Sequence, residues 1–313
     1  MGLFVAEFAR IPMGRQREIV GILANSATAI RNAQLQSLVS QGVAAEGPGR
    51  GKGNLVFVVG THHYHPEQSM PPLAKELDRL GFGTSVILPP GDPEENRNGQ
   101  GVPGLELLEQ ADAAVLFLRF LALDDKQFGH LERYVKSGKP VVGLRTSTHA
   151  FRYPADHPRV AWNEDFGRSV LGTHYLSHMQ TPTACRRLDQ AKAHPILTGL
   201  GDQPFTSPGQ LYITDLEPGC VPLLIGSGDA PKEYVVSDRF RTRLVARTES
   251  DILAWTWQNR YGARVFATTL GHPQDFAVPQ IMRLVVNGIH WAAGIPVPDG
   301  ATAIKTSQLE AGP

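Results

Sequence analysis

Cysteine, net charge and long apolar runs are all scarce in this chain of 313 residues. The two cysteines, Cys185 and Cys220, have neither CxxC nor Cys/His finger spacing, so the sequence predicts no disulfide framework and no structural zinc site. The 30 lysines and arginines balance the 30 aspartates and glutamates, and no long basic run occurs. Because counterion-driven binding to nucleic acid needs clustered basic charge, we expect no nucleic-acid partner.

The chain also lacks any uninterrupted stretch of about 18 apolar residues, so it predicts no helix that crosses a membrane. Its N-terminus reaches Glu7 and Arg10 too early for the apolar core of a signal peptide. We therefore expect a soluble, cytoplasmic protein. The hydrophobic fraction of 42% is enough for one large domain or two modest ones.

Patterning divides the chain into three parts. Within 1–53, apolar residues recur at roughly helical spacing and a glycine-rich linker follows, which predicts a helical extension. That extension could be a packing arm, a dimerisation helix or the result of a misassigned start, and these alternatives stay open. Residues 54–296 are predicted to form the main domain, and residues 297–313 a flexible tail.

Short apolar runs alternate with helical segments in the first half of the main domain. We predict strands at 55–60, 84–88, 113–118 and 141–144. We predict helices at 71–80, 105–110 and 124–137, the last with Asp124 or Asp125 as N-cap and Gly138 as C-cap. This alternation predicts an open, mostly parallel α/β sheet with helices on both faces. The second half predicts strands at 210–216 and 221–225, a hairpin of 252–258 and 264–270, and a helix at 278–293.

Histidines follow the first predicted strand, where ligands of open α/β sheets bind. His62, His63 and His65 lie within four residues. In an extended backbone, His63 and His65 would point the same way and could share a divalent metal or an anionic ligand. Zinc sites need three or four ligands, and the chain has no HExxH helix. The alternative is a polar loop with one functional histidine.

A second polar cluster, Arg145 to His149, follows the strand at 141–144. Arg145 offers a planar charged fork that suits carboxylate, phosphate or carbonyl oxygens. His149 could act as a general acid or base near neutral pH. Ser147 lacks the flanking glycines of a GxSxG elbow, so we expect no serine hydrolase. The alternative is an ordinary strand that runs into a polar loop.

Two further strand ends carry polar groups. His272 follows the last predicted strand and could be a partner for His149, with a structural histidine as the alternative. Arg119 ends the third strand, where it could add positive charge to the site or simply pair with Asp124 or Asp125.

Two segments resemble class I glutamine amidotransferases. The segment 140–149 resembles their nucleophile elbow, P-[IV]-x-G-[IV]-C-x-G-x-Q, and the segment 271–274 resembles their later H-P-E segment. Arg145 stands where the catalytic cysteine would be and Gln274 where the glutamate would be, so only His272 of that triad remains. Because a glutaminase needs a thiolate nucleophile, we expect no glutaminase activity.

The chain more closely resembles the ThuA-like, trehalose-utilisation family of the same superfamily, over residues 54–294. The resemblance is carried by the histidine-rich loop, the elbow with His149, and the segments 193–200, 210–212, 261–266, 270–272 and 287–294. Relatives often carry an acidic residue where this chain has Gln210, and many have histidine where it has Arg145. The resemblance implies a flavodoxin-like sheet and a role in the metabolism of disaccharides or keto sugars.

Two functions follow as hypotheses. One is a sugar-acting enzyme of hydrolase, lyase or isomerase type that takes a small-molecule carbohydrate at the strand ends. Its predicted catalytic residues are His149, His272, Arg145 and Ser147, and its predicted substrate-binding residues are His62, His63, Arg119 and Tyr212. The other is a non-catalytic binding or assembly module that forms a homo-oligomer through its N-terminal helices.

Overall fold

The computed structural model describes residues 51–91, 101–179, 182–228 and 250–307, together with the backbone of two short strands at 234–235 and 244–245. The predicted helical extension up to residue 50 lies outside the described residues, as do the last residues of the predicted tail, 308–313. Within the described part of the chain, no helix is long and apolar enough to span a membrane.

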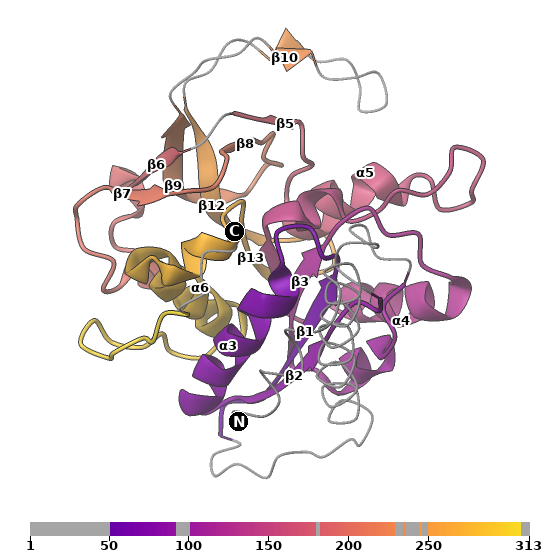
Figure 1. Ribbon diagram of the computed structural model, residues 1–313, viewed down its shortest axis with the longest axis horizontal. Helices are drawn as coiled ribbons and strands as arrows, with labels where there is room; N and C mark the ends of the chain where they lie inside the picture. The colour runs from indigo at the N-terminus through magenta and orange to yellow at the C-terminus, as the bar shows by residue number, and fades with distance from the viewer. Residues whose placement is uncertain are drawn as a thin grey trace, which may run out of the picture. The chain divides into compact units, whose positions relative to one another are not determined.

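The described residues form a nine-stranded sheet in the order β2-β1-β3-β4-β13-β12-β9-β6-β7 (Figure 1). Its strands are β1 Asn54–Gly60, β2 Gly83–Ile87, β3 Ala113–Leu118, β4 Val141–Leu144, β6 Thr183–Arg187, β7 Phe205–Ser207, β9 Val221–Gly228, β12 Ser250–Gln258 and β13 Arg264–Thr268. From β2 to β13 neighbouring strands are parallel, and from β13 to β7 they are antiparallel. The mostly parallel α/β fold is therefore confirmed for the half of the sheet that carries the predicted site.

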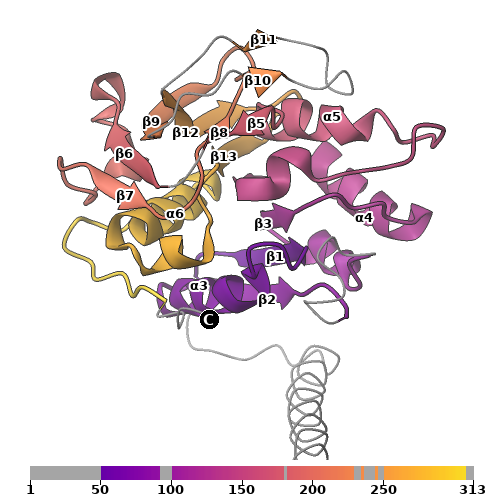
Figure 2. The same ribbon diagram turned by 45° about the horizontal axis from the view of Figure 1, so that its top comes forward.

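Helices cover both faces of the sheet. The α-helices are α3 Pro66–Arg79, α4 Asp125–Lys136, α5 Trp162–Phe166 and α6 Pro279–Ala292. Alternating side chains of β1 divide the core: Leu55, Phe57 and Val59 pack with α3 and α6, whereas Val56 and Val58 pack with α4 and α5. Figures 1 and 2 show these two helix pairs on opposite sides of the sheet. The period-two alternation of a doubly buried strand explains the two cores.

Short helices join many of the elements. They are the 3₁₀ helices η1 Leu105–Gln110, η2 Arg145–His149, η4 Asp189–Ala191, η5 Pro195–Leu197 and η7 Pro273–Ala277, and the π-helix η3 Gly167–Leu171. Asp124 caps α4 as predicted, because its side chain accepts a hydrogen bond from the Gln127 amide at 2.8 Å. Ser137 is the C-cap, and Gly138 follows it with a φ of 76°.

The helix predicted at 71–80 and the strand predicted at 210–216 differ most from the structure. Helix α3 begins at Pro66 rather than at residue 71, because Pro66 takes the first helical position and Pro71 and Pro72 lie inside the helix. The strand predicted at 210–216 is reduced to β8 Tyr212–Ile213, which pairs with β5 Ser177–His178 in a separate two-stranded sheet. A further small sheet pairs β10 Tyr234–Val235 with β11 Leu244–Val245.

The segment that follows α6 is held by hydrogen bonds as far as it is described. The Arg283 guanidinium donates to the carbonyls of Asp299 and Thr302. The Lys305 amide donates to Glu76 of α3 at 2.9 Å, and Arg79 donates to the Ala303 carbonyl at 2.7 Å. Residues 299–305 of the predicted tail thus lie along α3 and α6.

Candidate functional site

Strand β4 ends in a sharp elbow at Arg145. Its φ of 44° is in the left-handed region that non-glycine residues seldom adopt. The side chain is only 1% exposed. Its guanidinium carbon lies 4.2 Å from the ring centre of Tyr64 and 4.7 Å from that of Tyr212. The elbow therefore places a buried cation between two tyrosine rings, one from the loop after β1 and one from β8.

The polar atoms of Arg145 are only partly satisfied by the protein. Nη1 donates to the Thr269 carbonyl at 2.9 Å and to the Gln210 carbonyl at 3.4 Å. Nε and Nη2 are buried without a hydrogen-bond partner among the described residues. Burial lowers the pKa of Arg145, but the acidic groups of Tyr212, Tyr64 and Asp275 outweigh it, so the pKa lies above its ordinary value. Arg145 is thus a permanent positive charge inside the wall of the site.

His149 lies at the other end of η2 in an aromatic environment. Its ring is 4.5 Å from that of Tyr175, 5.1 Å from that of Phe120 and 5.9 Å from that of Tyr212. Burial, and then the positive charge of Arg119, hold the pKa of His149 well below its usual value of 6.5. His149 is therefore a neutral imidazole at pH 7, which can accept a proton.

Ser147 is engaged with the sheet. Its hydroxyl donates to the Leu116 carbonyl at 2.8 Å and accepts from the Leu118 amide at 3.0 Å, and the residue is fully buried. Both partners belong to the backbone of β3. The hydroxyl therefore holds the elbow to the neighbouring strand, and we propose a structural role for Ser147 in place of the predicted catalytic one.

The loop after β1 is not extended. The prediction that His63 and His65 point the same way and share a ligand assumed an extended backbone, and that assumption is wrong. Tyr64 has a φ of 69° and His65 a φ of 46°, so the side-chain alternation is broken between His63 and His65. His62 and His65 each place Nδ1 near a carboxylate oxygen of Glu67, at 3.3 Å and 3.1 Å. Among the residues that the structure describes, no group of three or more His, Cys, Asp or Glu could hold a metal ion.

Arg119 lies at the end of β3 beside the site. Its guanidinium carbon is 4.2 Å from the ring centre of Phe120, which is a ring neighbour of His149. The alternative partners predicted for Arg119 are engaged elsewhere, since Asp124 caps α4 and Asp125 pairs with Arg159 at 2.5 Å. Arg119 therefore adds positive charge next to His149.

His272 begins η7 and borders Tyr64, with 5.9 Å between the ring centres. Its Nδ1 accepts a hydrogen bond from the Gln274 amide at 3.4 Å. Burial and the charge of Arg145 lower the pKa of His272, and Asp275 partly offsets them. His272 and His149 thus flank the same cation, because Tyr64 lies next to His272 and Tyr212 next to His149.

Several residues of the site were not predicted from the sequence. Asp275 is fully buried and accepts hydrogen bonds from the amides of Gly271 and His272 and from the Ser207 hydroxyl. It directly follows the motif residue Gln274, which could have drawn attention to it. The other residues missed are Tyr64, Phe120, Arg152 and Tyr175. Of these, Tyr64 lies inside the histidine-rich loop, whereas Arg152 and Tyr175 come from irregular segments without a local signal.

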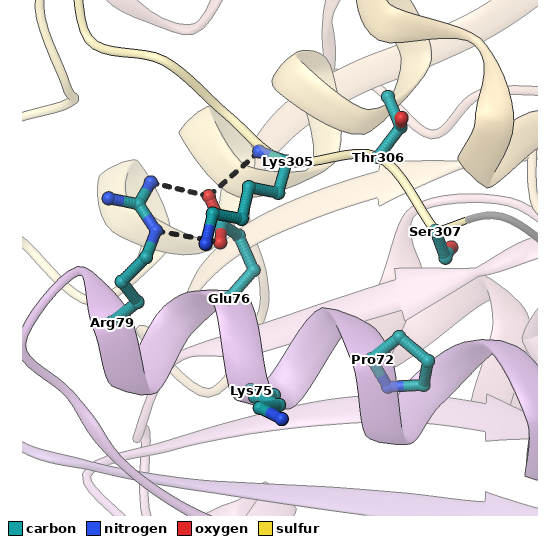
Figure 3. A pocket seen from close by; sticks show the side chains of 7 residues that line it. All are labelled: Pro72, Lys75, Glu76, Arg79, Lys305, Thr306 and Ser307. Atoms are coloured by element: carbon teal, nitrogen blue, oxygen red, sulfur yellow. Dashed lines mark hydrogen bonds and ion pairs between the residues drawn. The ribbon is translucent and has the colours of Figure 1, made fainter.

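A hollow elsewhere on the domain lies between α3 and the C-terminal segment (Figure 3). It has a volume of about 330 Å³ and is lined by Pro72, Lys75, Glu76, Arg79, Lys305, Thr306 and Ser307. None of the predicted site residues lines it. Figure 3 shows Glu76, at the wall of the hollow, hydrogen-bonded to both Arg79 and Lys305. The polar groups of the hollow therefore mainly hold the C-terminal segment on α3.

Comparison with known proteins gives a family and a fold. The family model described as trehalose utilisation, ThuA, matches residues 97–292, which leaves out β1 and its histidine-rich loop. A ThuA-like protein from Parabacteroides merdae is similar in structure, with a TM-score of 0.54 and 16% identity over 79% of this chain and 92% of the other. A ThuA-like protein from Bacteroides uniformis has a TM-score of 0.52 and 15% identity over 80% of this chain and 94% of the other.

The search of curated proteins gave no match. The two solved structures share the fold of this chain, and the family model covers more than half of its length. Because the family model matches more than half of its residues, the chain belongs to the ThuA, trehalose-utilisation family.

Proposed function

We propose that the protein takes a disaccharide or keto sugar at the carboxyl ends of β1, β3, β4 and β13, and that His149 moves a proton on it. Family membership supports a role in carbohydrate utilisation. The rings of Tyr64, Tyr175 and Tyr212 and the positive charges around them offer apolar faces and hydrogen-bond donors, which is the mixture that a small polar ligand requires.

The observation that carries the proposal is the state of His149. Its Nδ1 lies 3.4 Å from the Thr148 hydroxyl, which itself donates to the Arg145 carbonyl at 3.3 Å. In the tautomer in which Nδ1–H donates to this oxygen, the lone pair of the imidazole is on Nε2, and this is the tautomer that the proposed reaction uses. A neutral imidazole with its lone pair on Nε2 is a general base.

The reaction that suits this base is proton removal at a carbon next to a keto group. The C–H electron pair becomes the second bond of an enediolate, and the proton goes to Nε2 of His149. The negative charge develops on the former keto oxygen, where the fixed charges of Arg119 and Arg145 stabilise it. His272 accepts at Nδ1, so in the neutral state its proton is on Nε2 and can be donated to a substrate oxygen.

The test uses the full chain with trehalose and a keto-disaccharide. Thermal shift measures binding, and NMR in D₂O measures exchange of the C–H next to the keto group. We expect exchange in the native protein, loss of at least about 100-fold in His149→Gln with binding retained, and no change in His130→Gln on α4. Full exchange by His149→Gln would remove His149 from the mechanism. Binding without exchange in the native protein would favour the non-catalytic module, and absence of binding would overturn the proposal.

A further inference from the structure

We propose that the hollow between α3 and the C-terminal segment binds a phosphate group, either as inorganic phosphate or as the phosphate ester of a small sugar. This site goes beyond the proposed function and does not depend on it, because none of the described residues at the strand ends lines the hollow. Its volume of about 330 Å³ is within the range of small-molecule sites, about 300–1,000 Å³.

Cations outnumber anions on the walls of the hollow. Lys75 and Arg79 come from α3, one helical turn apart, and Lys305 comes from the C-terminal segment, residues 299–307. Glu76 is the one carboxylate among the described residues that line the hollow. The walls therefore attract an anion rather than a cation.

The carboxylate of Glu76 is already used by the protein. Its Oε2 accepts from Nε of Arg79 at 2.9 Å, and its Oε1 accepts from Nη2 of Arg79 at 2.6 Å and from the Lys305 amide at 2.9 Å. Burial raises the pKa of Glu76, but these hydrogen bonds outweigh it and hold the pKa below its ordinary value. In the described part of the chain, the ammonium groups of Lys75 and Lys305 donate no hydrogen bond, so both can bind a ligand.

A buried hydroxyl at the same hollow also points to a ligand. Ser307 is 7% exposed, and its hydroxyl has no hydrogen-bond partner among the described residues, although its amide donates to the Phe276 carbonyl at 3.1 Å. Figure 3 shows its side chain directed from the C-terminal segment towards α3. Because a buried hydroxyl without a partner is unfavourable, a ligand oxygen that accepts its proton would stabilise this arrangement.

A phosphate group suits the donors that line the hollow. A phosphate monoester carries a charge of about −1.5 to −2 at pH 7 and three strong acceptor oxygens. Its oxygens can accept from an ammonium group on each segment and from the Ser307 hydroxyl at the same time. The ring of Pro72 and the methylene stems of the lysines offer apolar surface beside these donors, which a sugar ring would contact.

Such a ligand would connect two segments that are far apart in the sequence. Lys75 belongs to α3, whereas Lys305 and Ser307 belong to the C-terminal segment. An anion held by both segments favours the state in which they are in contact. We therefore expect bound phosphate to slow hydrogen exchange of the backbone amides in residues 302–307.

The experiment titrates the full chain with inorganic phosphate, glucose 6-phosphate and glucose by calorimetry. We expect one saturable phosphate site with a dissociation constant of about 1 mM or tighter. The double variant Lys75→Gln/Lys305→Gln should weaken both phosphate probes at least about tenfold, and Ser307→Ala should weaken them about threefold. Tighter binding of glucose 6-phosphate would identify a sugar phosphate as the ligand, and equal affinity would show that the phosphate group alone is recognised.

The double variant Lys126→Gln/Lys136→Gln is the matched control, because it removes two exposed lysines from α4 on the other face of the sheet. It should leave phosphate binding unchanged. Absence of saturable phosphate binding, equal affinity in the native protein and in Lys75→Gln/Lys305→Gln, or an equal loss in the α4 control would overturn the site. Glucose that binds as tightly as glucose 6-phosphate and loses affinity in the same variants would also overturn it. None of these results bears on the proposed function, which the exchange assay with His149→Gln tests separately.

Discussion

The residue at the tip of the elbow determines which chemistry this fold supports. In the resemblance to amidotransferases, Arg145 stands where the nucleophile would be, and a guanidinium is never deprotonated in proteins and cannot attack a carbonyl. It is held between Tyr64 and Tyr212, and two of its nitrogens have no hydrogen-bond partner within the described part of the chain, so it is suited instead to stabilise negative charge through its field.

Replacing the hydroxyl of Ser147 distinguishes a structural role of this residue from a catalytic one. In Ser147→Ala, the Leu118 amide and the Leu116 carbonyl lose their partner, so we expect the free energy of unfolding to fall by about 1–3 kcal/mol. Sugar binding and proton exchange should be retained. Urea unfolding and the NMR exchange assay measure the two effects. Ser227→Ala, at an exposed position of β9, should be close to neutral, and a loss of exchange in folded Ser147→Ala would restore its catalytic role.

Asp275 allows a prediction about the pKa of its neighbour. Its carboxylate raises the pKa of His272, so Asp275→Asn should lower that pKa below its native value. Both carboxylate oxygens of Asp275 accept hydrogen bonds, so the NH₂ group of asparagine, which is itself a donor, would face another donor. We expect this to lower the free energy of unfolding by about 1–3 kcal/mol. NMR titration of the His272 ring and urea unfolding check both results. An unchanged pKa of His272 would mean that the carboxylate does not act on it.

At the scale of elements, two glycines in helix interiors should respond in opposite directions. A Cβ on Gly288 of α6 would lie 2.1 Å from the ring of Phe266, whereas a Cβ on Gly129 of α4 meets only the end of the Arg133 side chain at 3.3 Å. Gly288→Ala should therefore destabilise the protein by about 1–3 kcal/mol or more through overpacking. Gly129→Ala should stabilise it by up to about 1 kcal/mol. Denaturant unfolding of the pair tests whether α6 packs tightly on β13.

At the scale of the whole molecule, buried histidines make stability fall in acid. Burial lowers the pKa of His174 and of His290 to about 4, from an ordinary value of 6.5. The unfolded chain then binds more protons than the folded one between these values, so stability is full above pH 6.5 and is lost as the pH falls towards 4. Each histidine contributes a slope of about 1.4 kcal/mol per pH unit in this window.

Urea unfolding of the native protein and of His290→Gln at a series of pH values measures this slope. In His290→Gln, the slope of unfolding free energy against pH should be smaller by the contribution of one histidine, and the contribution of His174 should remain. A pH dependence that is the same in both proteins would show that His290 does not remain neutral in the folded state.

The parallel half of the sheet was predictable because its signals are local. Strands such as Ala113–Leu118 and Val141–Leu144 are continuous apolar runs between turn residues, and Asp124 is a helix cap that can be recognised from the residues beside it. The predicted start of α3 was wrong because local signals were ambiguous there. Proline is favoured in the first turn of a helix, and both Pro66 and Pro71 fit that preference.

The sequence by itself determined the elements of the parallel sheet, the presence of an arginine at the end of the strand Val141–Leu144, and the family to which the chain belongs. Only the tertiary structure decided which side chains surround Arg145, that Ser147 is hydrogen-bonded to β3, that burial lowers the pKa of His149, and that Arg119 and Arg152 share one ring. The physical reason is that the spacing of apolar residues within a short segment is enough to predict a strand or helix. Burial, hydrogen-bond partners and pKa values instead depend on groups that folding brings together from distant parts of the chain.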